Sequence, residues 1–194
     1  MTTLDPSPIA PPPGLTLCLI SVHGLIRGND LELGRDADTG GQTKYVVELA
    51  KALAEEPEVA EILLLTRLID DPAVDADYAA PVEALGPRAR ILRIPAGPPD
   101  YLPKEELWDH LDSFVDNAID TLRALDRPVD LLHSHYADAG HVGSRLSHLL
   151  GVPLVHTGHS LGRVKRRCLN AAGLRVEQSE QRYSIGRGIQ AGES

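Results

Sequence analysis

The chain has 194 residues, of which 42% are hydrophobic and 24% are charged, as in a globular protein with a core of its own. Its formal net charge of −9 at pH 7 argues against nucleic acid or an anionic membrane surface as the main partner. Cys18 and Cys168 lie far apart, which favours a reducing cytoplasm over a disulfide framework, and no apolar run reaches membrane-spanning length.

Two parts of the chain differ in composition. Residues 1–14 are rich in proline and lack the basic start and apolar core of a signal peptide, so we expect a disordered lead-in. Residues 15–194 carry the periodic apolar patterns of folded elements, and we expect them to form one domain.

Unbroken apolar runs predict strands that are buried on both faces, as in parallel sheets. In chain order these runs are residues 15–25, 61–68, 89–97, 129–136 and 152–159. Apolar residues at helical spacing predict helices over residues 42–56, 103–125 and 140–150, and the chain from Leu161 onward has the pattern of polar helix. Because strands and helices largely alternate, we expect an α/β fold with a Rossmann-like, doubly wound, mainly parallel sheet.

Ligands bind such sheets beyond the carboxyl ends of the strands. The loops expected there are residues 23–24 with 40–41, 95–97, 135–138 and 157–160. Gly40 and Gly41 follow Asp38 and Thr39, either of which can cap the next helix, and two glycines let the backbone approach a phosphate or a sugar hydroxyl. Lys104 is expected at a helix start, either as a solvated charge or as a contact to an anionic ligand.

The stretch Gly158-His159-Ser160-Leu161-Gly162 fits the pattern of the nucleophile elbow of serine hydrolases. In that fold an acidic residue and then a histidine follow the serine, but residues 161–194 contain neither Asp nor His. A loop that presents backbone amides, His159 and Ser160 to a ligand is therefore the preferred interpretation. A tight turn with no ligand is the structural alternative.

Two further groups of residues allow more than one interpretation. His133 and His135 share one face of a predicted strand, and with Asp138 they are the possible start of a metal site. No other set of ligands at metal spacing is evident, so we predict no metal and expect one buried and one ligand-facing histidine. The basic run 163–167 either attracts an anion or forms a solvated helix face.

Five stretches, in order, carry a family resemblance: SVHGLIRGNDLELGRDADTGGQTKYVVELAKAL, LLTRLI, RIPAGPPDYLPKEELWDHLDSFVDNA, HSHYADAG and HTGHSLGRVKRRCL. Together they resemble the N-terminal half of the sucrose-phosphate synthase and sucrose synthase family, which are retaining glycosyltransferases of the GT-B fold. The resemblance runs from Leu15 to the C-terminus. It implies that residues 15–194 are the acceptor-binding N-terminal domain of a GT-B enzyme.

The resemblance also implies a reaction and a set of residue roles. The reaction is transfer of glucose from UDP-glucose to fructose 6-phosphate or fructose, by same-face attack of the acceptor hydroxyl with the leaving phosphate assisting. No tightly bound cofactor is implied, and nothing in the sequence indicates Mg²⁺. Carried over by position, the acceptor contacts are Gly40, Gly41, Gln42, Lys104, His135 and Arg187, the catalytic contact is His159, and Gly158 and Ser160 lie near the donor sugar.

The sequence departs from the family in two ways. The second Rossmann-like domain, which holds the nucleotide, is missing before Ser194, so we expect a fragment, or one part of a split enzyme, that is inactive alone. Relatives commonly carry two arginines where this chain has Arg187 followed by Gly188, which leaves the choice between fructose 6-phosphate and fructose open. The alternatives are a catalytically inactive sugar-phosphate-binding fragment and, less favoured, a serine hydrolase.

Overall fold

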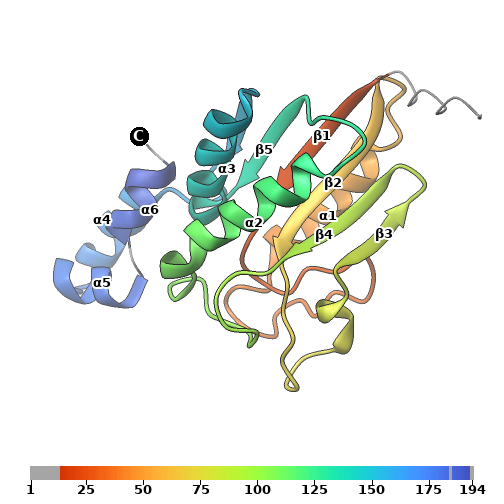
Figure 1. Cartoon of the computed structure of the whole chain (residues 1–194). Helices are drawn as coiled ribbons and strands as arrows, with labels where there is room; N and C mark the ends of the chain where they lie inside the picture. Colours follow the sequence, from red (N-terminus) through yellow and green to blue (C-terminus); the bar gives the residue numbers. More distant parts are fainter. Residues whose placement is uncertain (1–13, 184, 193–194) are drawn as a thin grey trace, which may run out of the picture.

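A computed structural model describes residues 14–183 and 185–192 and shows a six-stranded sheet with helices on both faces (Figure 1). The strand order is β3-β4-β2-β1-β5-β6. The strands are β1 (Leu15–Ile20), β2 (Val59–Arg67), β3 (Val82–Gly86), β4 (Ala89–Ile94), β5 (Leu131–His135) and β6 (Leu154–Thr157). All neighbouring pairs are parallel except β3 with β4. The predicted doubly wound, mainly parallel α/β fold is confirmed.

Alternate residues of the central strands build a core on each face of the sheet. Helix α1 (Gly41–Leu53) packs on one face, against a cluster that includes Leu19 and Leu64. Helices α2 (Leu111–Arg123) and α3 (Ala137–Leu150) cover the other face, against Ile20 and Leu65. Figure 1 shows α2 and α3 in front of the sheet and α1 behind it. Burial on both faces explains the unbroken apolar runs in the sequence.

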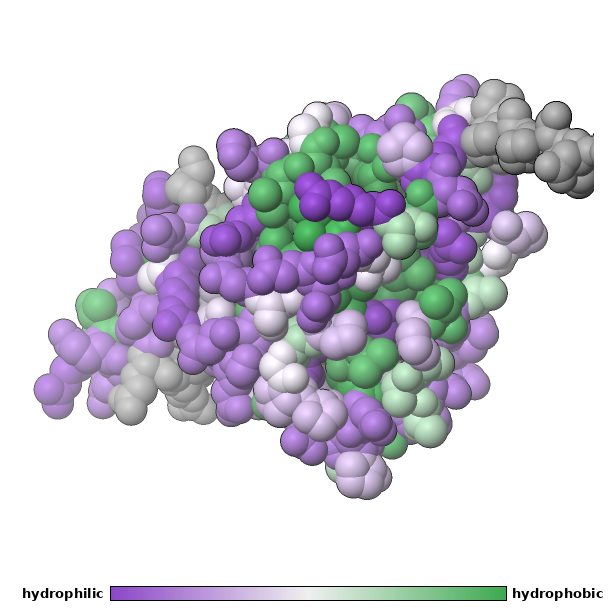
Figure 2. All heavy atoms as spheres, in the orientation of Figure 1, coloured by the Kyte–Doolittle hydropathy of each residue, from purple (hydrophilic) through white to green (hydrophobic). Residues whose placement is uncertain are grey.

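Three helices extend the domain beyond the sheet edge. They are α4 (Gly162–Ala171), α5 (Val176–Tyr183) and α6 (Ile185–Gly192). Helix α6 packs against α3 and α4, and its Ile185 is 3% exposed, whereas α4 has no buried residue. The surface of this extension is mainly hydrophilic (Figure 2). Across the part of the chain that the structure describes, every helix is too short or too polar to cross a bilayer.

The structure differs from the predicted elements in three places. Strand β3 and the short 3₁₀ helix η1 (Ala76–Ala79) lie in a segment for which the sequence predicts no element. The helix predicted over residues 103–125 is the 3₁₀ helix η2 (Leu107–His110) followed by α2, and α3 begins at Ala137 rather than at residue 140. The predicted disorder of residues 1–14 lies outside the described residues, apart from Gly14.

Candidate functional site

The carboxyl ends of three parallel strands and the start of α1 meet at one edge of the sheet. Ser21 follows β1, His135 ends β5, and the loop 158–160 follows β6. Gln42, in the first turn of α1, donates a hydrogen bond from Nε2 to Ser21 Oγ at 3.1 Å. This is the edge at which doubly wound sheets bind ligands.

The Gly40-Gly41 turn begins α1 without a side-chain cap. The predicted capping by Asp38 or Thr39 is wrong, because Thr39 Oγ1 accepts from the Leu25 amide and Asp38 faces Lys104. A Cβ atom at Gly40 or Gly41 would have no neighbour within 4 Å. The start of α1 therefore offers uncapped backbone next to open space, which favours a phosphate or a polar hydroxyl.

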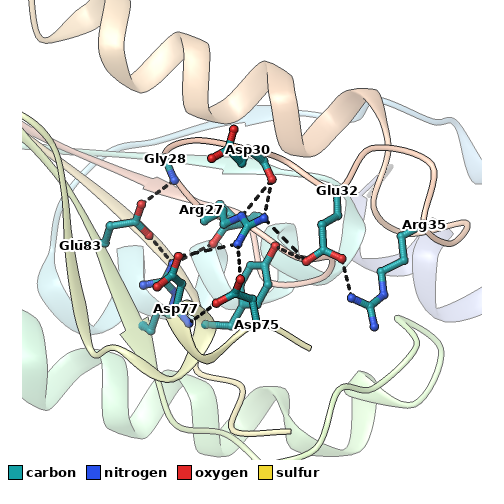
Figure 3. A network of polar contacts seen from close by, with 11 residues as sticks. Arg27, Gly28, Asp30, Glu32, Arg35, Asp75, Asp77 and Glu83 are labelled. Carbon is teal, nitrogen blue, oxygen red and sulfur yellow. Dashed lines mark hydrogen bonds and ion pairs between the residues drawn. The ribbon is translucent and has the colours of Figure 1, made fainter. Parts of the chain in front are cut away.

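A network of ion pairs holds the loop that leads from β1 to this turn (Figure 3). Arg27 donates from Nε to the Asp30 carbonyl at 3.0 Å, and its Nη1 lies 3.1 Å from Asp75 Oδ2. Arg93, whose side chain is fully buried on β4, pairs with Glu83 of β3 and donates from Nη2 to the Ile26 carbonyl at 3.0 Å. The antiparallel strand β3 thereby fastens the loop to the sheet.

Lys104 lies in a turn before η2, not at a helix start as predicted. Its ammonium pairs with the buried carboxylate of Asp38 and lies 3.2 Å from Glu105 Oε1. The Lys104 amide also donates to Asp38 Oδ2, at 2.8 Å. Burial alone would lower the pKa of Lys104, but the two carboxylates outweigh burial and raise that pKa. Lys104 is therefore a fixed cation.

Lys104 lines a cavity between the sheet edge and the helical extension. The empty volume in and in front of this hollow is about 480 Å³, a figure that includes open solvent at its mouth. Lys165 of α4 also lines it, and burial together with the charge of Lys104 lowers the pKa of Lys165. Lys104 and Lys165 line the cavity together with Glu105 and Asp138, whose carboxylates are paired with Lys104 and His23. Lys165, with the shared charge of Lys104, is therefore the group that favours an anionic ligand there. The lining residues are Lys104, Glu105, Trp108, Tyr136, Ala137, Asp138, Ser160, Gly162, Lys165, Ile185 and Gly188.

Tyr136 joins β5 to α3 in a strained conformation. Its φ of 77° and ψ of 169° lie in a region that residues other than glycine rarely adopt. The ring stands edge-on to His23, with centroids 4.8 Å apart, and the residue lines the cavity. His159, in the loop after β6, also has a positive φ of 48°. Such strain clusters at binding sites, where the surrounding structure imposes it.

Three histidines gather beside the cavity. His135 is fully buried, and its Nδ1 lies 3.1 Å from Nε2 of the exposed His159. The His133 and His135 ring centroids are 4.1 Å apart, and His133 Nε2 is hydrogen-bonded to Thr157 Oγ1 at 2.8 Å. Burial lowers the pKa of His135 to about 3 and also lowers the pKa of His159. Both rings are therefore neutral at pH 7.

The metal and hydrolase alternatives lack the contacts that they need. Asp138 Oδ2 lies 2.8 Å from Nδ1 of His23, so this carboxylate is turned to His23 and not to His133 or His135. In residues 14–183 and 185–192 no three His, Cys, Asp or Glu side chains are placed to hold a metal ion. All the histidines are described, and none hydrogen-bonds to the Ser160 hydroxyl, so Ser160 has no general base in this structure.

Comparison with known proteins identifies the family. Residues 40–183 match the family model of the glycosyl transferase 4-like domain. The chain belongs to this family. A curated relative, probable sucrose-phosphate synthase 2 of Arabidopsis thaliana, is 46% identical in an alignment of 206 positions that covers 92% of this chain and 20% of the relative. A probable sucrose-phosphate synthase of Vicia faba is 45% identical in an alignment of 207 positions, with the same coverage.

A solved structure supports the same assignment for this glycosyl transferase 4-like domain. Sucrose-phosphate synthase from Thermosynechococcus elongatus is 30% identical and superposes with a TM-score of 0.69, over 89% of this chain and 39% of that one. The predicted family and the α/β fold of one half of a GT-B enzyme are thereby confirmed. The chain spans about one fifth of the length of the curated relatives it matches.

The glycosyl transferase 4-like domain brings some of the predicted site residues together and separates others. Lys104 and Ser160 line the cavity, and His135 is buried behind His159. Arg187 instead points into a neighbouring hollow, where its Nη1 lies 3.1 Å from Asp109 Oδ1, and Gly188 lines the cavity. The predicted roles of Gly40, Gly41, Gln42 and Gly158 in ligand binding stay predictions.

Residue-by-residue sequence reasoning gave no cavity role to several of the lining residues. Among them are Trp108, Tyr136, Asp138 and Lys165. Lys165 had a signal, because it lies within the basic run 163–167 next to the Gly-His-Ser loop. Tyr136 lies in the loop 135–138, which the sequence predicts at the ligand edge, whereas Trp108 belongs to a stretch that carries the resemblance and no local pattern places it in a cavity.

Proposed function

We propose that this chain is the acceptor-binding half of a glycosyltransferase that moves glucose from UDP-glucose to fructose 6-phosphate, or to fructose, in sucrose metabolism. The observation that carries the proposal is the cavity with Lys104 and Lys165, two cations in a chain of net charge −9. A phosphorylated sugar matches this chemistry, because the ammonium groups bind the phosphate while hydroxyl groups bind the ring. The relatives named as sucrose-phosphate synthases support the same substrate class.

Each part of the site has a role in this proposal. Lys104 and Lys165 bind the phosphate, and Tyr136 and Ser160 hydrogen-bond to the acceptor sugar. The uncapped start of α1 contacts the acceptor through its backbone, and His159 hydrogen-bonds to a hydroxyl of the transferred glucose. In this proposal the described residues contribute positioning and electrostatics, and the step requires no nucleophile from them.

The bond changes of the proposed step balance without a protein nucleophile. An acceptor hydroxyl oxygen forms the new bond to the anomeric carbon of glucose, on the face from which the diphosphate departs. The bond between that carbon and the diphosphate oxygen breaks, and the hydroxyl proton passes to the departing oxygen. The nucleotide sugar is held by a further domain or a partner chain, in the cytoplasm.

A binding measurement on this chain tests the proposal. Isothermal titration compares fructose 6-phosphate, fructose and inorganic phosphate, with Lys165→Met as the variant and Lys44→Met, an exposed lysine on α1, as the control. Loss of one charge-assisted contact of about 1.5–3 kcal/mol predicts a roughly 10- to 150-fold weaker affinity for fructose 6-phosphate. Equal affinity for the sugar and its phosphate, or an unchanged affinity in Lys165→Met, would refute the proposed site.

The second candidate function is sugar-phosphate binding without transfer. The observation that favours it is that the cavity in the described residues accounts for a phosphorylated acceptor, whereas a site for a nucleotide is not evident there. Incubation with UDP-glucose and fructose 6-phosphate, in the presence of the domain or partner chain that holds the nucleotide sugar, separates the two candidates. Formation of a disaccharide phosphate together with UDP supports transfer, and binding of fructose 6-phosphate without that product supports the second candidate.

A further inference from the structure

The contact between His135 and His159 links the inside of the sheet to the ligand side of the site. His135 is the last residue of β5 and is fully buried, whereas His159 is exposed in the loop after β6. The ring of Tyr45 on α1 stands edge-on to both imidazoles, with centroid distances of 5.8 Å to His135 and 5.2 Å to His159. The pair therefore forms where β5, α1 and the loop after β6 meet.

The location of the protons follows from the partners of each nitrogen. A neutral imidazole carries one proton, so one nitrogen donates and the other accepts. His135 Nε2 is buried and, among the described residues, has no hydrogen-bond partner. A buried N–H without an acceptor costs more than an unused lone pair, so the proton of His135 lies on Nδ1. That Nδ1 proton is then donated to Nε2 of His159, 3.1 Å away.

We infer that His135 is a positioning residue, which donates to Nε2 of His159 and thereby holds His159 as the tautomer with its proton on Nδ1. In this tautomer His159 offers an N–H donor to its ligand, and a sugar hydroxyl oxygen acting as acceptor is the matching group. Within the described part of the chain, no group is hydrogen-bonded to His159 Nδ1. The ligand assignment rests on the proposed function, whereas the tautomer does not.

Neighbouring contacts hold the two rings in place. His133 lies against His135 on the same strand face, with its own Nε2 bonded to Thr157 Oγ1. Thr157 is the last residue of β6, and the chain then turns at Gly158 into His159 with its positive φ. The β5–β6 pairing thus sets the distance between the two imidazoles. His135 acts on the ligand only through His159.

Nitrogen-15 NMR of the labelled 194-residue chain tests the tautomer without any ligand. Long-range proton–nitrogen correlation at pH 7.5 distinguishes a ring protonated on Nδ1 from one protonated on Nε2, and His159→Gln identifies the His159 signals. The expected result is that both His159 and His135 carry the proton on Nδ1. A His159 ring protonated on Nε2 would overturn the inference.

Two substitutions of His135 separate positioning from structure. The amide of His135→Asn places an N–H donor near the position of Nδ1, so His159 should keep its proton on Nδ1. His135→Leu fills the space without a donor, and His159 should then show Nε2 protonation. An unchanged His159 tautomer in folded His135→Leu refutes the inference. If His135→Leu does not fold, the His159 tautomers measured in the wild type and in His135→Asn decide whether the inference holds.

Addition of fructose 6-phosphate and UDP-glucose to the same samples tests the proposed function separately. A ligand-induced shift of the His159 Nδ1–H signal supports contact with the sugar. Absence of a shift, together with the expected tautomer, contradicts the ligand role and leaves the positioning role of His135 intact. A ligand-induced shift together with a His159 ring protonated on Nε2 supports contact with the sugar and overturns the positioning role of His135.

Discussion

Replacement of Gly188 by arginine gives the sharpest test of ligand choice at the cavity. Gly188 lies inside α6 and lines the cavity, whereas Arg187 points away to Asp109. A Cβ atom at position 188 would lie 3.8 Å from the Ala137 Cβ, which is ordinary van der Waals contact. The arginine side chain therefore enters without a steric conflict at its base, and its guanidinium becomes a third cation beside Lys104 and Lys165.

The expected gain follows from one added charge-assisted hydrogen bond. Such a bond contributes about 1.5–3 kcal/mol, which corresponds to roughly 10- to 150-fold in affinity. The two lysines repel a third cation, since burial and, to a smaller extent, the charge of Lys104 already lower the pKa of Lys165. We therefore expect a gain at the lower end of this range, which is about 10-fold tighter binding of fructose 6-phosphate by Gly188→Arg. Fructose lacks the phosphate and should bind as before.

Isothermal titration of both sugars measures this difference, with Gly188→Ala as the matched control. Alanine and arginine are both good helix formers, so each variant should stabilise α6 by about 0.5–1 kcal/mol relative to glycine. Only the arginine variant should change the affinity for fructose 6-phosphate. An equal gain for fructose, or a gain in Gly188→Ala, would show that helix stability and not phosphate contact is responsible.

The remaining predictions concern pH, the serine and the ion-pair network. Because folding keeps His135 neutral with a pKa of about 3, against 6.5 for a free ring, its contribution to stability is present above pH 6.5 and is lost as the pH falls toward 3. Urea melts should show a slope of up to about 1.4 kcal/mol per pH unit from this ring, which His135→Asn reduces. Ser160→Ala should weaken sugar binding by roughly 2- to 10-fold in titration, and a fluorophosphonate should leave the wild-type chain unlabelled. Arg93→Met should lower the free energy of unfolding by about 3–5 kcal/mol, and Arg90→Met, which breaks a more exposed pair with Glu61, by less than about 1 kcal/mol. Equal losses of unfolding free energy in Arg93→Met and Arg90→Met would contradict the reasoning that a buried ion pair is more costly to break than an exposed one.

The sheet was predictable because its central strands are buried on both faces. Strands β1 and β2 therefore consist of long apolar runs that exclude most other structures. Strand β3 has no such signal, because its residues alternate between exposed and partly buried positions and Glu83 lies on its inner side. It exists because it pairs with β4 and because Arg93 holds Glu83, which are tertiary contacts.

The site was predictable as a set of loops but not as a set of contacts. The glycine pair and the Gly-His-Ser loop follow strands, so their place at the carboxyl edge follows from topology. The partner of Lys104 is Asp38, 66 residues away, and no local pattern connects them. Whether Arg187 or Gly188 faces the cavity depends on the rotation of α6 about its axis, and that rotation is set by packing on α3 and α4.

The strained backbone of Tyr136 has a consequence for attempts to stabilise this protein. Glycine adopts φ of 77° without the cost of about 1–3 kcal/mol that such a conformation imposes on a side chain. Tyr136→Gly would relieve this strain, but it would also remove the ring that stands edge-on to His23 and forms part of the cavity wall. The packing of the ring and the relaxation of the backbone therefore act in opposite directions at this residue, and a stability gain from glycine is offset by the loss of the ring.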